Sequence, residues 1–390
     1  MKKNITYQPS GKPHKKAPVG KKGPVGKEAT VGKEAISKPA AIGMDLGDKS
    51  SRYCILNGEG EIVKEGGVLT TKKAMLQLFS NMPRWRIAIE VGSHSPWVNR
   101  LLHSLGFEVT VANSRCIPLI SASTQKSDRQ DAQMLARLVR MDPKLLRPIR
   151  HRGEQAQVDL MRIKVRAALV ETRTSLVNTA RGLTKATGER LPACDADYMG
   201  EKQAEELPLE LQEVLKPLLQ EVESLTGKIK ECDAELQQIA EEKYPETQLL
   251  RQIKGVGPLI ALTFVLTVED PERFHKSRDV GCYVGLRPKR SESGEKQPQL
   301  GITKEGDIYL RKMLVQGAQY ILGHHGPDTD LKRWGLQLAE RGGKNAKKRA
   351  IVAVARKLGV LLHRLWVSGE VYEPLRNSQA RQAAAQKAAA

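Results

Sequence analysis

The chain has 390 residues, with 64 Lys and Arg against 44 Asp and Glu, which gives a formal net charge of +20. This length predicts two or three domains rather than one small core, and the positive charge favours a polyanionic partner. No apolar run approaches the roughly 20 residues that span a bilayer, and no two of the five cysteines have CxxC spacing. These features argue against a membrane protein, a structural zinc site and a disulfide framework, and they predict a cytoplasmic protein.

The two ends of the chain have compositions that predict disorder. Residues 1–40 are rich in Gly, Pro and Lys, and the tripeptide Val-Gly-Lys recurs every six residues from Val19. So few apolar side chains cannot form a core, and we expect a disordered basic arm. The arm is either a tether for nucleic acid or a dispensable extension. The Ala- and Gln-rich residues 377–390 are expected to form a disordered tail.

Residues 41–150 predict an α/β domain from their apolar runs and turn residues. In chain order we expect strands at 41–45, 51–56 and 61–68, a helix at 72–81, a strand at 86–91, a helix at 96–105, a strand at 108–112 and a helix at 128–141. Three strands followed by alternating helices and strands form the element order of a ribonuclease-H-like fold.

The remaining chain is expected to be helical, in two regions. In residues 151–250, the apolar residues from Leu211 to Ile239 alternate at spacings of four and three, which is the pattern of a coiled-coil seam. The seam serves either a helical hairpin within the chain or a coiled coil between two chains. Residues 251–376 predict a second, mostly helical domain, in which the turn at 255–258 resembles the phosphate-binding turn of a helix-hairpin-helix.

Four carboxylates carry the strongest chemical signal. Asp45 and Glu90 each end an apolar strand-like run, and α/β sheets bind ligands at such strand ends. Asp128 and Asp131 lie three residues apart and share one face of the predicted helix. Taken singly, Asp45 fits a solvated turn acid and Asp128 fits a helix-capping charge. Taken together, the four predict a site for one or two divalent ions.

The ion follows from the ligand chemistry. Oxygen-only ligands favour Mg²⁺, or Mn²⁺, over zinc. Two such ions could stabilise the attacking and leaving oxygens at a phosphorus centre. In a chain of charge +20, the acids predict metal-dependent phosphoryl transfer on nucleic acid.

Several short motifs together resemble the insertion sequence 110/1111 family of transposases. In the first half of the chain they are Gly43-Met44-Asp45, Ile89-Glu90-Val91-Gly92 and Lys126-Ser127-Asp128-Arg129-Gln130-Asp131-Ala132. In the second half they include Gly255-Val256-Gly257-Pro258, Tyr283-Val284-Gly285-Leu286-Arg287-Pro288 and Ser291-Glu292-Ser293-Gly294. The ordered set covers about residues 41–325. It resembles the family's DEDD, RuvC-like domain followed by a C-terminal serine transposase domain.

The resemblance implies a serine nucleophile beside the metal-bound acids. It maps this serine to Ser293, with Ser291 as a nearby rival in the same basic loop. A serine oxygen can attack a scissile phosphate and form a covalent protein–DNA intermediate. The resemblance further implies donor and target DNA as substrates, a structured non-coding guide RNA from the element, nucleoid association, and a homodimer or tetramer.

Basic residues in the C-terminal half are candidates for nucleic-acid contacts. Two groups stand out, one close to the serine and one ahead of the apolar segment at 350–362: Lys304, Arg311 and Lys312, then Lys344, Lys347, Lys348 and Arg349. Each group is either a set of phosphate contacts or a solvated helix face. Aromatic residues make up only 4% of the chain, so we expect recognition by charge and shape rather than by base stacking.

Three other functions fit parts of the pattern. A RuvC-like, metal-dependent Holliday-junction resolvase or nuclease would use the same four acids with water as nucleophile and leave Ser293 idle. An actin-like ATPase or sugar kinase would use the turn at 43–47 for phosphate, but the accompanying phosphate and adenosine motifs are missing. A non-catalytic nucleic-acid-binding protein would have no use for the four acids.

Overall fold

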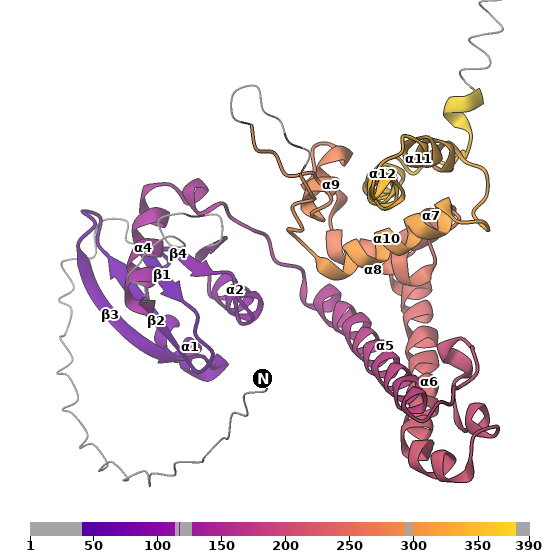
Figure 1. Ribbon diagram of the computed structural model, residues 1–390. Helices are drawn as coiled ribbons and strands as arrows, with labels where there is room; N and C mark the ends of the chain where they lie inside the picture. The colour runs from indigo at the N-terminus through magenta and orange to yellow at the C-terminus, as the bar shows by residue number, and fades with distance from the viewer. Residues whose placement is uncertain (1–40, 114–116, 118–126, 293–297, 299, 380–390) are drawn as a thin grey trace, which may run out of the picture. The chain divides into compact units, whose positions relative to one another are not determined.

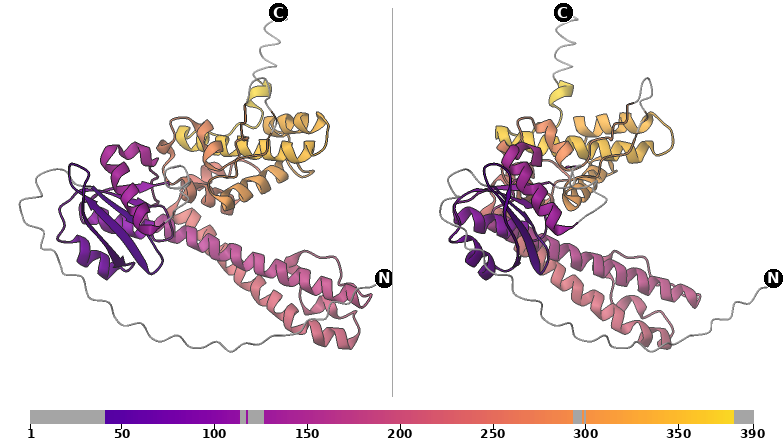
Figure 2. Two further views of the ribbon diagram at one scale, coloured as in Figure 1. Left: turned by 60° about the vertical axis from the view of Figure 1, so that its left-hand side comes forward. Right: turned by 90° about the vertical axis from the view of Figure 1, so that its left-hand side faces the viewer.

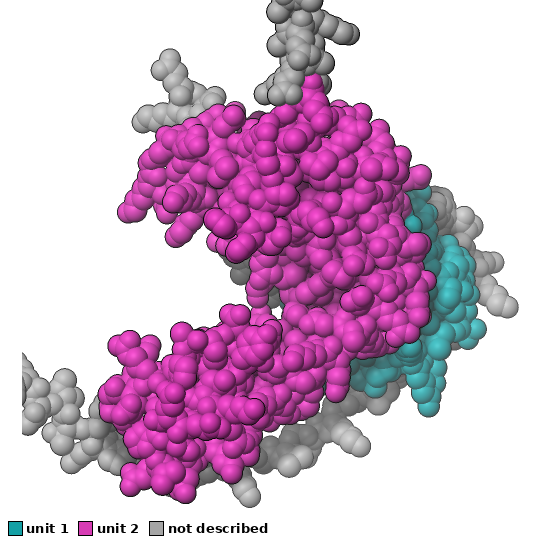
Figure 3. Space-filling model, turned by 90° about the vertical axis from the view of Figure 1, so that its right-hand side faces the viewer, with its two compact units in different colours: residues 1–151 teal, residues 152–390 magenta. Residues whose placement is uncertain are grey.

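The computed structural model describes residues 41–113, 117, 127–292, 298 and 300–379 (Figure 1). The predicted basic arm at 1–40 and residues 380–390 of the predicted tail lie outside this range. Contact clustering divides the chain into two compact units, residues 1–151 and 152–390, which are coloured separately in Figure 3. Within the described ranges, every helix is too short or too polar to span a bilayer.

Unit 1 is built on a five-stranded mixed sheet. Its main elements are β1 (Ala41–Asp45), β2 (Ser50–Leu56), β3 (Ile62–Leu69), α1 (Lys72–Phe79), β4 (Arg86–Glu90), α2 (Ser95–Ser104), β5 (Glu108–Ala112) and α4 (Asp128–Met141). The strand order is β3-β2-β1-β4-β5. β1, β4 and β5 are parallel, whereas β2 and β3 are antiparallel to their neighbours. The predicted α/β architecture is confirmed, and the ribonuclease-H-like assignment stays a prediction.

The two faces of this sheet are covered by different helices because successive strand residues point to opposite faces. On one face, α1 and α2 pack on large apolar residues, among them Ile42, Met44, Ile87 and Ile89. On the other face the strands present small residues, Ala41, Ala88 and Ala112, and α4 packs on them through Leu135 and Val139. The sequence therefore brings α4 close to the sheet.

The regular secondary structure of unit 2 is helical within the described residues, apart from an isolated bridge between Pro288 and Ile302. Its α-helices are α5 (Glu154–Ala186), α6 (Leu209–Lys243), α7 (Glu246–Leu250), α8 (Pro258–Val268), α9 (Val280–Tyr283), α10 (Ile308–Leu322), α11 (Asp330–Glu340) and α12 (Ala346–Ser368). The mostly helical character predicted for the C-terminal part is confirmed. The largest core of the unit is formed by α7 to α12 around Phe264, Leu314 and Leu358.

Helices α5 and α6 form a hairpin and lie side by side in Figures 1 and 2. Most of the predicted seam on α6 is buried within the chain, including Leu215, Val222, Ile229 and Leu236. The structure thus supports the hairpin interpretation of the seam. A dimer or tetramer, which stays a prediction, needs another surface. In Figure 3, unit 2 is hollowed between this projecting hairpin and the rest of the unit.

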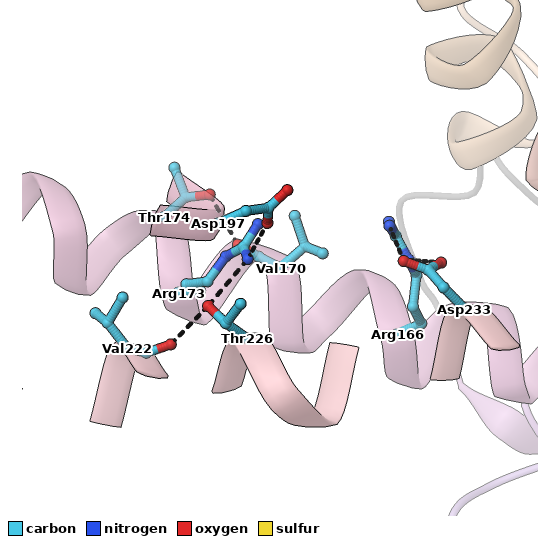
Figure 4. A network of polar contacts seen from close by, with 8 residues as sticks. All are labelled: Arg166, Val170, Arg173, Thr174, Asp197, Val222, Thr226 and Asp233. Carbon is cyan, nitrogen blue, oxygen red and sulfur yellow. Dashed lines mark hydrogen bonds and ion pairs between the residues drawn. The ribbon is translucent and has the colours of Figure 1, made fainter. Parts of the chain in front are cut away.

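Buried polar contacts fix how α5 packs on α6 (Figure 4). Arg173, which is only 8% exposed, donates to Asp197 Oδ1 at 2.5 Å and to Thr226 Oγ1 at 3.1 Å. Two turns earlier, Arg166 donates through Nε and Nη2 to both carboxylate oxygens of Asp233, at 2.8 and 3.0 Å. Because bidentate guanidinium–carboxylate pairs demand a fixed geometry, they set the alignment of the two helices.

The described end of the chain is held to α11. Asp330 Oδ2 accepts from the backbone N–H of Asn377 at 2.7 Å, and Asp330 Oδ1 accepts from that of Ser378 at 3.2 Å. Burial raises the pKa of Asp330, but the hydrogen bond from the Ser378 hydroxyl and these two backbone bonds outweigh it and keep the pKa below its usual value. The first residues of the predicted disordered tail are therefore anchored by hydrogen bonds that composition does not reveal.

Candidate metal centre

A glycine in β1 sets the distance between α4 and the sheet. A Cβ atom built on Gly43 would lie 2.1 Å from the carbonyl oxygen of Ala132 and 2.3 Å from the backbone nitrogen of Ala136. Any larger residue would collide with the α4 backbone. Gly43 therefore allows the helix to lie directly on the strand that ends in Asp45.

Asp45 and Glu90 emerge together from this face of the sheet. They end β1 and β4, which are parallel neighbours, so both carboxylates lie at the same edge. Asp45 follows Gly43 by two residues, and Glu90 follows Ala88 by two residues. Since side-chain direction alternates along a strand, both acids point to the face that α4 covers.

The start of α4 adds two more carboxylates at this edge. The helix is capped by Ser127, whose hydroxyl accepts from the backbone N–H of Gln130 at 3.3 Å. Asp128 and Asp131 lie in the first turn. Acids are favourable there because of the helix dipole, so their positions satisfy a structural preference as well as a chemical one.

A side chain on β3 anchors the start of α4, and the sequence analysis missed it. Glu65 accepts from Arg129 Nε at 2.9 Å and from Gln133 Nε2 at 2.6 Å. The hydrogen bond from Arg129 is the largest cause of the lowered pKa of Glu65. Arg129 directly follows Asp128, so this contact fixes the helix turn that carries the acids. No sequence pattern reveals it, because the partners are 64 residues apart.

The pKa of Asp45 reflects the influence of the other three carboxylates. The pKa of Asp45 is raised to about 7, first by burial and then by a side-chain hydrogen bond with Glu90. The negative charges of Glu90, Asp128 and Asp131 raise it further. A hydrogen bond between two carboxyl groups needs a shared proton. Burial and these charges therefore favour the neutral form of the Asp45 carboxyl group.

The donor set fits a hard divalent ion, although the side chains are not arranged around one. In the described part of the chain, no three Asp, Glu, His or Cys side chains have the spacing of a closed metal site. The negative charges of Glu90, Asp128 and Asp131 all disfavour ionised Asp45, so the four carboxylates repel one another. Mg²⁺ or Mn²⁺ would relieve this repulsion, and Asp45, Glu90, Asp128 and Asp131 would hold it.

The predicted nucleophile, Ser293, lies outside the described residues, and Ser291 is exposed. The base of their loop is well defined. Lys289 N–H donates to Gly301 O, and Thr303 N–H donates to Arg287 O, both at 2.9 Å. Two backbone segments cross so closely that a Cβ on Gly285 would lie 1.9 Å from the carbonyl oxygen of Glu305.

Two of the three basic candidates near this loop have side-chain partners within the protein. Arg311 Nη1 donates to Val284 O at 2.9 Å and to Glu305 O at 3.0 Å, so it ties together the two ends of the loop. Lys312 lies 3.5 Å from a carboxylate oxygen of Glu171 on α5. Lys304 is exposed and has a φ of 60°. Their contacts with nucleic acid stay predictions.

The second basic group gathers at one helix end. Lys344 precedes α12, and the first turn of the helix carries the exposed cations Lys347, Lys348 and Arg349. Cations are unfavourable at a helix N-terminus, where the dipole is already positive. This cluster therefore does not stabilise the helix, and a polyanion bound there would relieve the repulsion.

Comparisons with known proteins identify the family. Residues 42–187 match a family of DEDD type described as Transposase, and residues 247–332 match one described as Transposase IS116/IS110/IS902 family. The chain is 31% identical to a Sinorhizobium fredii protein that bears the name transposase y4pF/y4sB, across 77% of this chain and 78% of that protein. The chain belongs to the IS110/IS1111 family of insertion-sequence transposases. It is also 28% identical to the transposase for insertion sequence element IS1111A of Coxiella burnetii, across 85% of this chain and 90% of that one.

The two family matches coincide with the two regions built above. The DEDD match contains all four acids, together with Glu65, which anchors the start of α4. The second match contains the base of the serine loop and Arg311. The resemblance inferred from short motifs is thereby confirmed.

Proposed function

We propose that this transposase cuts and rejoins DNA at a divalent-metal centre held by Asp45, Glu90, Asp128 and Asp131, with Ser293 as the nucleophile. One observation carries the proposal. Asp45 ends β1, and acids from two other elements, Glu90 of β4 with Asp128 and Asp131 of α4, all act on its carboxyl group. Repulsion among these carboxylates destabilises the folded protein. A divalent cation bound at a phosphoryl-transfer site would offset this repulsion, which explains why the acids are clustered.

The chemistry balances with a single serine. Ser293 Oγ forms a bond to the scissile phosphorus, the bond from phosphorus to one bridging DNA oxygen breaks, and the serine proton passes to a carboxylate or to solvent. A free DNA hydroxyl then attacks the phosphoserine linkage, restores the phosphodiester and releases the serine. A bound divalent ion would offset the charge that develops on the phosphate oxygens.

The loop base supports a role for the segment that contains Ser293. Arg311 binds carbonyl oxygens on both sides of the loop, and Gly285 permits the close backbone crossing beside it. Such a base can hold a projecting segment in a fixed direction. We further propose that the element's guide RNA and the DNA contact the basic cluster at the start of α12, and that the active species is a homodimer or tetramer.

The test is a denaturing gel. Purified protein, with its co-purifying RNA, Mg²⁺ and end-labelled DNA that carries the element's junction, is quenched and separated. We expect a covalent protein–DNA adduct with the wild type and with Ser291→Ala. Neither Ser293→Ala nor Asp45→Asn should form one, because the first lacks the nucleophile and the second lacks a ligand.

Other patterns contradict the proposal in different places. Strand cleavage without an adduct in any lane, and undiminished in Ser293→Ala, would identify water as the nucleophile, as in a resolvase. An adduct that persists in Asp45→Asn would remove the metal centre from the reaction. An adduct lost only in Ser291→Ala would assign the reaction to the rival serine.

A further inference from the structure

An arginine on the sheet face of the acid cluster has no hydrogen-bond or ion-pair partner among the described residues. Arg52 lies on β2 directly opposite Asp45 in the antiparallel β1–β2 pair. It is exposed, and within the described residues no hydrogen bond or ion pair engages its guanidinium group. Directly opposed residues share a face of the sheet, so Arg52 lies on the face that carries the acids.

A second contact confirms that Arg52 lies on the face of the sheet that α4 covers. Cys54, two residues after Arg52, packs on Ala132 and Ala136 of α4. The side chain of Arg52 then runs away from Asp45 and across β3. A Cβ built on Gly67, its partner on β3, would lie 3.1 Å from Arg52 Nη1. Because strands are about 4.8 Å apart, the guanidinium lies roughly 10 Å from the strand of Asp45.

Arg52 lines a cavity of about 500 Å³ together with one of the four acids, Asp128. The other residues of its lining are Tyr53, Glu65, Gly66, Ser127 and Arg129. Arg129 is already paired with Glu65. Arg52 is therefore the cation in the lining of this cavity that is not paired with a carboxylate among the described residues.

We propose that this cavity is a phosphate-binding subsite, in which Arg52 binds a backbone phosphate of the DNA strand being cut, one or two nucleotides from the scissile phosphate. A guanidinium group suits a phosphate because its planar N–H donors match the phosphate oxygens. Neighbouring acids would repel a strand that lacks such a counter-charge. Phosphate contacts fix the register of a nucleic acid without reading its sequence, so the subsite would position the strand.

The inference rests on the proposed function only for which strand is bound, and its test does not require cleavage. The full-length protein is titrated, in EDTA, with a labelled 30-nucleotide DNA single strand at several salt concentrations. Each neutralised phosphate contributes about 0.7 to the slope of log affinity against log salt for a single strand. Arg52→Ala should weaken binding and reduce the slope by about this amount. Arg52→Lys should retain most of it, because the charge remains.

The matched control is Lys73→Ala. Lys73 is exposed on α1, which covers the opposite face of the same sheet, and the substitution removes the same charge. It should leave affinity and slope closer to the wild type than Arg52→Ala does. Equal effects of the two substitutions would overturn the subsite, because the loss would then reflect net charge alone.

The same titration with RNA of identical sequence distinguishes the polymers. Dependence on Arg52 with RNA but not with DNA would assign the cavity to RNA and overturn the proposal. The outcome is separable from the proposed chemistry. If Arg52→Ala reduces the slope of log affinity against log salt while no protein forms an adduct, the subsite stands and the serine mechanism is rejected. If the wild type forms the adduct but Arg52→Ala leaves the slope unchanged, only the subsite is rejected.

Discussion

Gly43 shows how one residue determines the geometry of the site. It removes the side chain that would separate β1 from α4, and it lies two residues from Asp45. A short helix-to-sheet distance is what brings the acids of α4 to the strand ends. The glycine is required for close approach rather than for an unusual backbone conformation.

We expect Gly43→Ala to destabilise unit 1 by about 1–3 kcal/mol, because the α4 backbone must move to admit a methyl group. The measurement is urea unfolding, with Gly92→Ala as the control, since a Cβ at Gly92 meets nothing within 4 Å. If the two substitutions lower the free energy of unfolding equally, α4 does not pack directly on β1 at Gly43.

Asp45 should make the metal-free protein sensitive to pH. Its folded pKa of about 7 exceeds the ordinary value of 3.8, so it stays protonated in the folded chain where it would ionise in the unfolded one. The stability that this protonated carboxyl group contributes to the folded state is fully present below pH 4 and is lost as the pH rises to 7. Asparagine does not ionise, so the Asp45→Asn protein does not lose stability in this way as the pH rises.

In EDTA, Asp45→Asn should therefore be more stable than the wild type at pH 8, by about 1–2 kcal/mol after allowance for solvent screening. The two proteins should converge at about pH 4, where the Asp45 carboxyl group becomes protonated in the unfolded chain as well. Thermal unfolding at both pH values measures this, and Mg²⁺ should narrow the difference at pH 8. Parallel pH profiles for the two proteins would contradict the raised pKa.

At the scale of elements, the α5–α6 hairpin shows that a sequence pattern can be correct while its partner is undetermined. A heptad seam demands an apolar partner, but nothing in its spacing says whether that partner is in the same chain. Here α5 supplies it, and the pairs of Arg166 with Asp233 and of Arg173 with Asp197 add alignment.

We expect Leu219→Ala to destabilise unit 2 by about 2–5 kcal/mol, because its side chain is fully buried in the hairpin. Val214→Ala on the same helix is the control, since Val214 is 67% exposed. Urea unfolding should give a midpoint that is independent of protein concentration. A midpoint that rises with concentration would mean that the seam is completed by a second chain.

At the scale of the whole molecule, the local patterns proved sufficient for the elements. Runs of apolar residues bounded by turn residues gave β1, β5 and α4 their correct bounds. Asp45 and Glu90 were also accessible, because parallel strands end at a common sheet edge. The i, i+3 spacing of Asp128 and Asp131 then placed both on one helix face.

The supporting residues were not accessible in this way. Glu65 and Arg311 bind partners that only tertiary structure brings near, 64 and 27 residues away in the sequence. Arg52 is placed opposite Asp45 by strand register alone. Arg311 even suggested a different role, because a basic residue near a candidate nucleophile resembles a phosphate contact. The acids of a site follow from local patterns, whereas the groups that hold and surround them follow from tertiary structure.

The most direct measurement is the affinity of the full-length protein for Mn²⁺, followed by electron paramagnetic resonance of the free ion. We predict that Asp45→Asn and Asp131→Asn each weaken binding at least about tenfold, which corresponds to 1.4 kcal/mol. Asp48→Asn, whose side chain is 90% exposed close to Asp45, should bind as the wild type does. Mn²⁺ binding that is unchanged in both cluster variants would contradict a metal centre at these carboxylates.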